Sequence, residues 1–400
     1  MNNKKQKKEK PVYKPGDKVR IKNSYYTFSK QYPKGYLKLR KRRKIGIKSV
    51  LRIFALSLAF ALIVGVAFFC VDLALKISLS PMNDSSSADT SAFLSNDKIK
   101  ENGLRALYMP YTKLGDEQYI KDTIKKTVRK DGNSVIIDFK TKEGKLCYSS
   151  LHEYAIAGNC SIFDNDTIRK AVRLFEDAGI AVAARVSCFE DSIVAEKVPD
   201  VAVKYMNTDV NWLDGSDENG GKAWLNPCSR NARDYVLSVI NELRSFRINC
   251  FILDSVQFPS GENTLGATYP YEKDKEKRNA VLKEFITKAV SSGDENSLFF
   301  LSVSATDALE GNDSIYFGNI LDSDAFGIIV DTAERPDSYV IDKKTDFVSI
   351  LSLYSSINGK MQGKALIPMV NVEEYSGSYF RALRKNGYGS FVIYSQNGEY

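Results

Sequence analysis

Histidine is almost absent from this chain of 400 residues, in which His152 is the only one. A single histidine excludes zinc sites built on paired imidazoles, including HExxH metalloproteases and metal-dependent deacetylases. It also makes a Ser/His/Asp triad depend on one residue. The sequence therefore predicts that any general acid or base is a carboxylate, and that the protein uses neither a metal nor a cofactor.

Cysteines at metal-site or redox-site spacing are also lacking. The chain has six cysteines, none of them in a CxxC pair, and Cys70 lies inside a long apolar run. The other five form an odd number, which argues against an obligatory disulfide framework.

Positive charge is scarce outside the N-terminal segment. Residues 1–50 contain 18 of the 57 lysines and arginines but only two acidic residues, Glu9 and Asp17, so the net charge of this segment is about +16. The net charge of the whole chain is only +8. The remaining 350 residues carry about −8. Nucleic-acid binding needs a clustered basic face, and the body of the chain therefore is not predicted to bind nucleic acid.

One long run of residues has no charge at all. Residues 53–71 (IFALSLAFALIVGVAFFCV) are 19 uncharged positions, and a helix of this length rises ~28 Å, about the thickness of a bilayer core. The basic run at residues 38–48 should stay in the cytoplasm. These features predict a single-pass type II protein of the cell membrane whose body is extracellular. A buried core helix and a cleavable signal peptide are the less favoured alternatives.

Four segments follow from this pattern. Residues 1–50 are predicted to be a disordered, basic cytoplasmic tail, with contact to anionic lipid as the alternative. Residues 51–75 are the predicted membrane helix, residues 76–98 a Ser/Asp-rich linker, and residues 99–400 the folded body.

The body alternates short apolar runs with amphipathic segments. Eight near-continuous apolar runs are typical of parallel strands that are buried on both faces; they cover residues 104–109, 134–139, 180–186, 250–253, 298–304, 326–330, 365–370 and 390–394. Helical periodicity between them predicts an α/β fold, a (β/α)8 TIM-type barrel. An open doubly wound sheet is the alternative, although no glycine-rich phosphate loop follows any strand.

Two departures from a regular barrel are expected. Too few residues follow the last strand for an eighth helix, and residues 92–103 are predicted to cover that gap from the N-terminal side. The connection at residues 187–228 is unusually long, and long loops on the C-terminal face of a barrel are often functional.

Polar residues at strand C-terminal ends are the candidate site residues, because these ends face the active-site mouth of a barrel. They are Asp138, Arg185, Asp254, Asp307, Asp331, Glu373 and Glu374. The only tryptophans, Trp212 and Trp224, lie in the long connection. Indole faces beside carboxylates are typical of sugar sites, where a carboxylate pair can cleave a glycosidic bond without histidine or metal. Structural roles for Asp138 and Trp224 remain alternatives.

Several segments resemble a known family. They are residues 103–111 (GLRALYMPY), 134–148 (SVIIDFKTKEGKLCY), 180–200 (IAVAARVSCFEDSIVAEKVPD), 222–227 (KAWLNP), 251–259 (FILDSVQFP) and the stretch 389–394. In this order they resemble a bacterial glycoside-hydrolase-like barrel family, formerly a domain of unknown function and distantly related to amylase-like barrels. The resemblance covers residues 103–400 and implies that Asp254 is the nucleophile on the fourth strand.

The chain departs from the family pattern near this strand. Ser255 and Gln257 stand where the family has tyrosine and arginine, and Thr306 stands where it has aspartate, with Asp307 one position later. A missing arginine matters because a guanidinium holds a neighbouring carboxylate ionised. These departures leave a second reading open, a weakened barrel that binds wall glycan as a scaffold.

The sequence thus predicts a membrane-anchored extracellular glycoside hydrolase that acts on a cell-wall or surface polysaccharide. Asp254 would be nucleophile or base and Asp307 or Asp331 the acid. The predicted substrate-binding residues are Asp138, Arg185, Trp224, Trp212 and Gln257. A barrel that serves as a non-carbohydrate partner in an envelope complex is a third hypothesis.

Overall fold

The chain contains two compact units, Met1–Ser80 and Pro81–Tyr400. The computed structural model describes residues 18–21, 24–28, 39–41, 96–216, 218, 220–259, 264–311, 323–333, 335–336, 347–361, 363–372 and 379–396. The predicted membrane helix at residues 51–75 lies outside the described residues, as do Glu373 and Glu374. Among the helices that are described, none is both long enough and apolar enough to cross a membrane.

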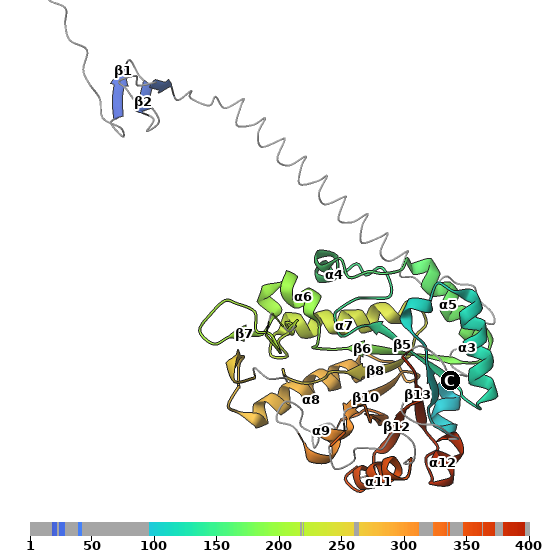
Figure 1. Cartoon of the computed structure of the whole chain (residues 1–400). Coiled ribbons are helices and arrows are strands. Elements are labelled where there is room, and N and C mark those ends of the chain that lie inside the picture. Colours follow the sequence, from blue (N-terminus) through green and yellow to red (C-terminus); the bar gives the residue numbers. More distant parts are fainter. Residues whose placement is uncertain are drawn as a thin grey trace, which may run out of the picture. The chain divides into compact units, whose positions relative to one another are not determined.

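The first unit contains a small antiparallel sheet (Figure 1). Its strands, in the order β1-β2-β3, are β1 (Lys18–Ile21), β2 (Ser24–Phe28) and β3 (Leu39–Lys41). This differs from the disordered tail that the sequence predicted. The physical reason is local composition, since β2 reads SYYTF and aromatic and β-branched residues favour strands.

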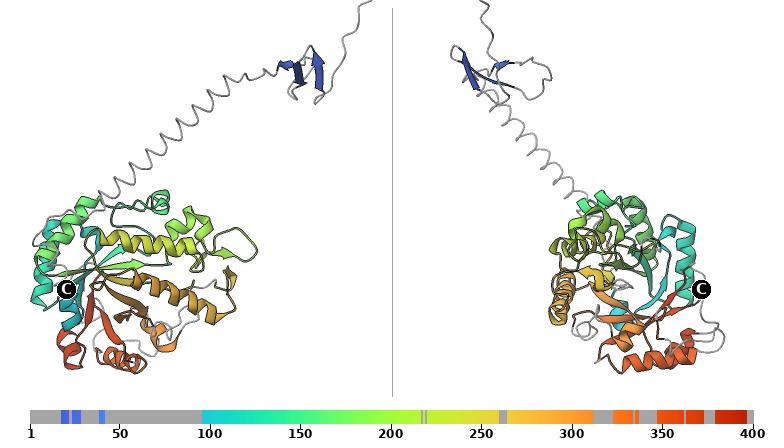
Figure 2. Two further views of the ribbon diagram at one scale, coloured as in Figure 1. Left: turned by 180° about the vertical axis from the view of Figure 1, so that it is seen from behind. Right: turned by 60° about the vertical axis from the view of Figure 1, so that its left-hand side comes forward.

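The second unit is a closed barrel of eight parallel strands, which confirms the predicted TIM-type α/β architecture (Figures 1 and 2). Its strands lie at the eight predicted runs. In chain order they are β4 (Arg105–Tyr108), β5 (Ser134–Lys140), β6 (Ala181–Ser187), β8 (Cys250–Asp254), β10 (Leu298–Ser304), β11 (Gly327–Asp331), β12 (Ala365–Asn371) and β13 (Phe391–Tyr394). Pairing of β13 with β4 closes the barrel.

Helices surround the strands on the outside (Figure 2). They are α3 (Glu117–Arg129), α4 (Glu153–Gly158), α5 (Asn165–Asp177), α6 (Ser192–Lys197), α7 (Arg230–Arg244), α8 (Lys275–Ser291), α9 (Ala305–Glu310), α11 (Phe347–Asn358) and α12 (Tyr379–Lys385). Several begin at an N-cap whose side chain accepts a backbone N–H three residues later, as Asp116 does for α3 and Ser229 for α7. Capping thus fixes where the outer helices start.

Side chains alternate between the inside and the outside of the barrel. On β8, Cys250 and Ile252 belong to the cluster that fills the interior, while Phe251 and Leu253 pack under the helices. The same period of two places the last inward residue of each strand at the C-terminal mouth. This alternation selects which strand-end side chains can meet.

Residues 96–102 form a helix at the opposite end of the barrel. Ile99 is fully buried in the interior cluster, and the Asn96 side chain donates to the carbonyl oxygens of Asn249 (3.2 Å) and Asn296 (2.8 Å), which precede β8 and β10. The described part of this segment thus closes the N-terminal end of the barrel, which is the side from which residues 92–103 were predicted to cover the gap.

The long connection after β6 has secondary structure of its own. It contains α6, a 3-10 turn at Pro199–Val201, and β7 (Lys204–Tyr205), which pairs antiparallel with β9 (Ala267–Thr268) from the connection after β8. Two connections on the C-terminal face are therefore joined by a two-stranded sheet.

Candidate active site

Three neighbouring strands bring a carboxylate, a guanidinium and a second carboxylate together at the mouth. Asp138 ends the inward face of β5 and is the register partner of Arg185 on β6, and Asp254 ends β8. Arg185 Nε and Nη2 both donate to Asp254 Oδ2, at 3.0 and 2.7 Å. Its Nη1 lies 3.7 Å from Asp138 Oδ1. One guanidinium therefore lies between two carboxylates.

A tyrosine completes the contacts of Asp138. The Tyr108 hydroxyl, at the end of β4, donates to Asp138 Oδ2 at 2.6 Å, and its ring packs 4.6 Å from that of Tyr394 on β13. Burial raises the pKa of Tyr108 well above its usual value, and the neighbouring Asp138 raises it further. The phenol is therefore a proton donor in this contact at neutral pH.

The pKa values of the carboxyl groups at the mouth are shifted in opposite directions. Burial works against the charged form of Asp254, but Arg185 and Lys142 outweigh it and hold the pKa of this carboxyl below its usual value. Burial raises the pKa of Asp138 and of Asp331, and the charge of Asp254 adds to both increases. A carboxyl that stays ionised beside carboxyls that hold protons more tightly is the arrangement that acid–base catalysis needs.

Asp331 and Asp307 occupy different settings. Asp331 ends β11, accepts the Ala333 N–H at 2.8 Å through Oδ1, and lies close enough to Arg185 and Asp254 for their charges to act on its pKa. Asp307 lies in the first turn of α9, where Ser304 Oγ donates to its Oδ2 at 2.7 Å. The structure thus joins Asp331 to the Asp254 group, whereas the printed contacts of Asp307 hold the start of a helix; its catalytic role stays a prediction.

Lys142 and Glu190 are two loop residues of the site that the sequence analysis did not identify. Lys142 Nζ lies 3.1 Å from Glu190 Oε2, and the Ser255 hydroxyl donates to the same oxygen at 3.1 Å. Burial would lower the pKa of Lys142, but Asp254 and Glu190 together raise it. Both side chains come from loops beyond the strand ends, where residue spacing carries no information about direction. Tyr108 could have been found, because it lies near the C-terminal end of the first predicted strand, residues 104–109.

Asp254 has a guanidinium partner although the residues near β8 depart from the family pattern. Gln257, which stands where the family has arginine, is half-buried in the loop after β8, and its binding role stays a prediction. Arg185 supplies the guanidinium that holds Asp254 instead. Ser255 adopts a left-handed backbone with φ of 52° and turns its hydroxyl to Glu190.

The tryptophans are not available for sugar stacking, which corrects their prediction as substrate-binding residues. Trp212 is 0% exposed and Trp224 is 3% exposed, and both belong to a small cluster with Val203 and Ala267. Trp224 Nε1 donates to Asp214 Oδ2 at 3.0 Å. The indoles therefore form the core of the lobe that β7 and β9 join, because large apolar side chains there have no other surface to cover them.

The sole histidine lies outside this group. His152 is the N-cap of α4, and its Nδ1 accepts the Tyr154 N–H at 3.2 Å. Within the described ranges, no group of three or more His, Cys, Asp or Glu side chains is placed to hold a metal ion.

Comparisons with known proteins identify several solved structures and one family model that are similar to the chain. Solved structures similar to the chain include a hypothetical protein from Ruminiclostridium thermocellum (22% identity, 49% of this chain and 96% of that one, TM-score 0.43). Another is the glycoside hydrolase domain of PelA from Pseudomonas aeruginosa (11% identity, 74% of this chain and 96% of that one, TM-score 0.43). A third is the Flavobacterium johnsoniae chitobiase (10% identity, 74% of this chain and 44% of that one, TM-score 0.45). No curated protein matches the chain. A family model matches residues 106–304, which span the strands from β4 to β10 and carry Asp138, Arg185 and Asp254. In this region the chain is similar to the family described as "Putative glycosyl hydrolase domain".

Proposed function

We propose that this protein hydrolyses glycosidic bonds in a cell-wall or surface polysaccharide, with Asp254 as the ionised carboxylate. The observation that carries the proposal is the double hydrogen bond from Arg185 to Asp254 Oδ2, at 3.0 and 2.7 Å, beside carboxyls whose pKa is raised by burial. Glycoside hydrolysis requires one carboxylate and one carboxylic acid on either side of the scissile bond, and neither metal nor histidine.

The roles follow from these environments. Asp254 serves as nucleophile or as the base that activates water, because its pKa is lowered. Asp331 serves as the acid that protonates the leaving oxygen, because its pKa is raised and Ala333 occupies only its Oδ1. Asp138 is less suited to transfer a proton, since Tyr108 and Arg185 engage both of its oxygens.

The membrane location belongs to this proposal as well. The apolar run at residues 53–71 and the basic run at residues 38–48 support a type II anchor with the barrel outside the cell. An external barrel would meet wall or surface polysaccharide directly.

The test is the release of reducing ends from peptidoglycan, α-glucans and β-glucans by the purified full-length chain. Asp254→Asn should lower the rate by several orders of magnitude, because an amide keeps the shape but can neither form a glycosyl ester nor accept a proton. Asp166→Asn, on the exposed surface of α5, is the matched control and should retain full activity.

Two results would contradict the assignment. Hydrolysis that persists in a folded Asp254→Asn variant removes Asp254 from the mechanism. A wild-type chain that binds these glycans but releases no reducing ends supports the scaffold function, which the substitutions at Ser255 and Gln257 would then explain.

A further inference from the structure

A cavity lies away from the carboxylates, between the connections that follow β6 and β8. Its volume is about 710 Å³, within the range of small-molecule sites. It is lined by Lys204, Tyr205, Asn207, Thr208, Asp209, Asn226, Thr268, Tyr269 and Pro270. None of these residues belongs to the candidate active site. Because both connections follow strand C-terminal ends, the cavity is on the same face of the barrel as the mouth.

Two tyrosine rings form walls of this cavity and are held in place from behind. The Tyr269 ring packs against Phe258, with centroids 4.9 Å apart and planes at 34°. The Tyr205 ring lies against Gly266, where a Cβ would be only 3.2 Å from the ring. Both rings also pack against the cluster of Trp212 and Trp224. Rings that are fixed in this way lose little entropy when a ligand binds.

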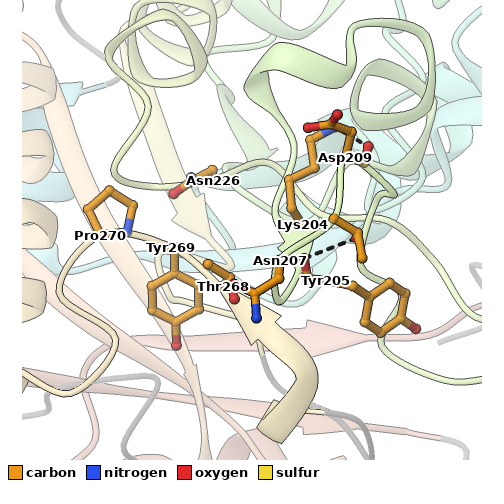
Figure 3. A pocket seen from close by; sticks show the side chains of 9 residues that line it. Lys204, Tyr205, Asn207, Asp209, Asn226, Thr268, Tyr269 and Pro270 are labelled. Atoms are coloured by element: carbon orange, nitrogen blue, oxygen red, sulfur yellow. Dashed lines mark hydrogen bonds between the residues drawn. The ribbon is translucent and has the colours of Figure 1, made fainter.

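Polar groups lie between these rings. In the view of Figure 3, Thr268 and Asn207 are drawn between Tyr269 and Tyr205, and all of these residues line the cavity together with Asn226. The Thr268 hydroxyl is buried without a hydrogen-bond partner among the described residues. The Asn226 amide accepts the Cys228 N–H at 2.9 Å and still has N–H groups to donate. Amides and a hydroxyl beside aromatic rings match a ligand with both hydroxyl groups and apolar faces.

The charges of the lining favour a neutral ligand. Lys204 Nζ donates to the Asp209 carbonyl oxygen at 3.2 Å and to Asn211 Oδ1 at 2.7 Å, so its charge holds the turn after β7. The exposed Asp209 carboxylate would repel an anion. Phosphate and carboxylate ligands therefore fit poorly.

We propose that this cavity is a second glycan-binding site, which holds a neutral stretch of polysaccharide beside the barrel mouth. The class of ligand rests on the proposed function, whereas the site does not require the barrel to hydrolyse anything. Pyranose rings offer C–H faces to Tyr205 and Tyr269 and hydroxyl groups to the amides of Asn226 and Asn207, which line the cavity. A second contact point would keep the enzyme on its polymer between cleavage events, by raising the local concentration of chain.

The experiment measures binding separately from hydrolysis. Maltohexaose, cellohexaose and chitohexaose are titrated calorimetrically into the full-length chain carrying Asp254→Asn. We expect two binding sites per chain for at least one of them. Adding Tyr269→Ala should remove one site or weaken it about tenfold, since a tenfold change corresponds to about 1.4 kcal/mol, the magnitude of one aromatic contact.

Matched variants separate a lost contact from a damaged fold. Tyr269→Phe keeps the ring and its packing on Phe258 and should retain binding within about threefold. Tyr271→Ala removes an exposed tyrosine that lies two residues later in the chain but does not line the cavity, and it should leave binding unchanged. If Tyr269→Ala does not fold, Tyr205→Ala provides the test, because Tyr205 lies on a two-residue strand of the loop lobe.

The outcomes distinguish this site from the proposed activity. Two sites in Asp254→Asn that persist unchanged in both Tyr269→Ala and Tyr205→Ala would overturn the second site, and so would the absence of saturable binding for all three oligosaccharides. A wild-type chain that binds through the tyrosines yet releases no reducing ends would overturn the hydrolase proposal and leave the second site standing.

Discussion

Arg185 is the residue on which the charge state of the mouth depends. It donates twice to Asp254 and lies 3.7 Å from Asp138, and these carboxylates in turn raise its own pKa. Without the guanidinium, burial would govern Asp254 and favour the neutral acid. The ionised carboxylate therefore exists because Arg185 is present.

Replacing Arg185 should change the pH dependence of the reaction. In Arg185→Gln, only Lys142 and the Ser255 backbone N–H still oppose burial, so the pKa of Asp254 rises and the acid limb of the pH–activity profile moves to higher pH. Arg185→Lys keeps the charge but loses the double hydrogen bond and should shift less. The measurement is kcat/KM against pH for each folded variant. An unchanged acid limb in Arg185→Gln would mean that Asp254 does not set it.

The sole histidine acts as a structural acceptor. His152 Nδ1 caps α4, and burial lowers the pKa of the imidazole. A protonated ring cannot accept the Tyr154 N–H, so the cap requires the neutral form.

Stability should therefore decrease on mild acidification. The contribution of His152 is complete above its unfolded pKa of about 6.5, decreases as pH falls through that value, and is lost below the folded pKa. Urea unfolding at several pH values measures this loss, and the single imidazole gives one NMR titration curve. His152→Asn keeps an N-cap acceptor that does not titrate and should remove this part of the pH dependence. The same pH dependence in His152→Asn would exclude the cap as its source.

At the scale of elements, a buried ion pair joins β5 to the long connection after β6. Lys140 Nζ lies 2.8 Å from Asp191 Oδ2, with both side chains 0% exposed, and it also donates to the Ser187 carbonyl oxygen at 2.8 Å. Asp191 Oδ1 in turn accepts the Val194 N–H as the N-cap of α6. The pair holds the segment that carries Glu190 over the mouth.

Breaking this pair from one side should be more damaging than removing it entirely. Asp191→Ala leaves a buried ammonium without its carboxylate and should reduce the free energy of unfolding by about 3–5 kcal/mol. Lys140→Met combined with Asp191→Leu removes both charges and should recover part of this loss. Urea denaturation of the single and double variants measures the coupling. Strictly additive effects would show that the two side chains do not stabilise each other.

At the scale of the whole molecule, the charge is divided between the ends of the chain. Residues 1–50 carry about +16 and the rest about −8, and the apolar run at residues 53–71 separates the two parts. A basic tail remains in the cytoplasm when the adjacent segment inserts into the membrane.

Protease accessibility tests this orientation. Protease added to intact, wall-stripped cells should degrade residues 100–400 and spare the basic tail, as detected with antibodies against each part. A cytoplasmic protein of the same cells should survive as the control for membrane integrity. A protected barrel would exclude the extracellular location and the polysaccharide substrate with it.

The sequence by itself determined the architecture and predicted the type of chemistry. Eight apolar runs specified eight strands, because strands buried on both faces must be apolar throughout. Period-two alternation also placed Asp138, Asp254 and Asp331 at one end, since each closes the inward face of its strand. A single histidine already pointed to carboxylates.

Only the tertiary structure decided which side chains meet. Arg185 reaches Asp254 because β6 pairs with β8, in a register that sequence spacing does not encode. Lys142 and Glu190 enter the site from loops, and loop direction depends on packing such as the buried Lys140–Asp191 pair. The sequence also could not decide whether the tryptophans face a ligand or are buried. In the structure, the segments that contain β7 and β9 cover Trp212 and Trp224. Burial of the two indoles removes their apolar surface from water.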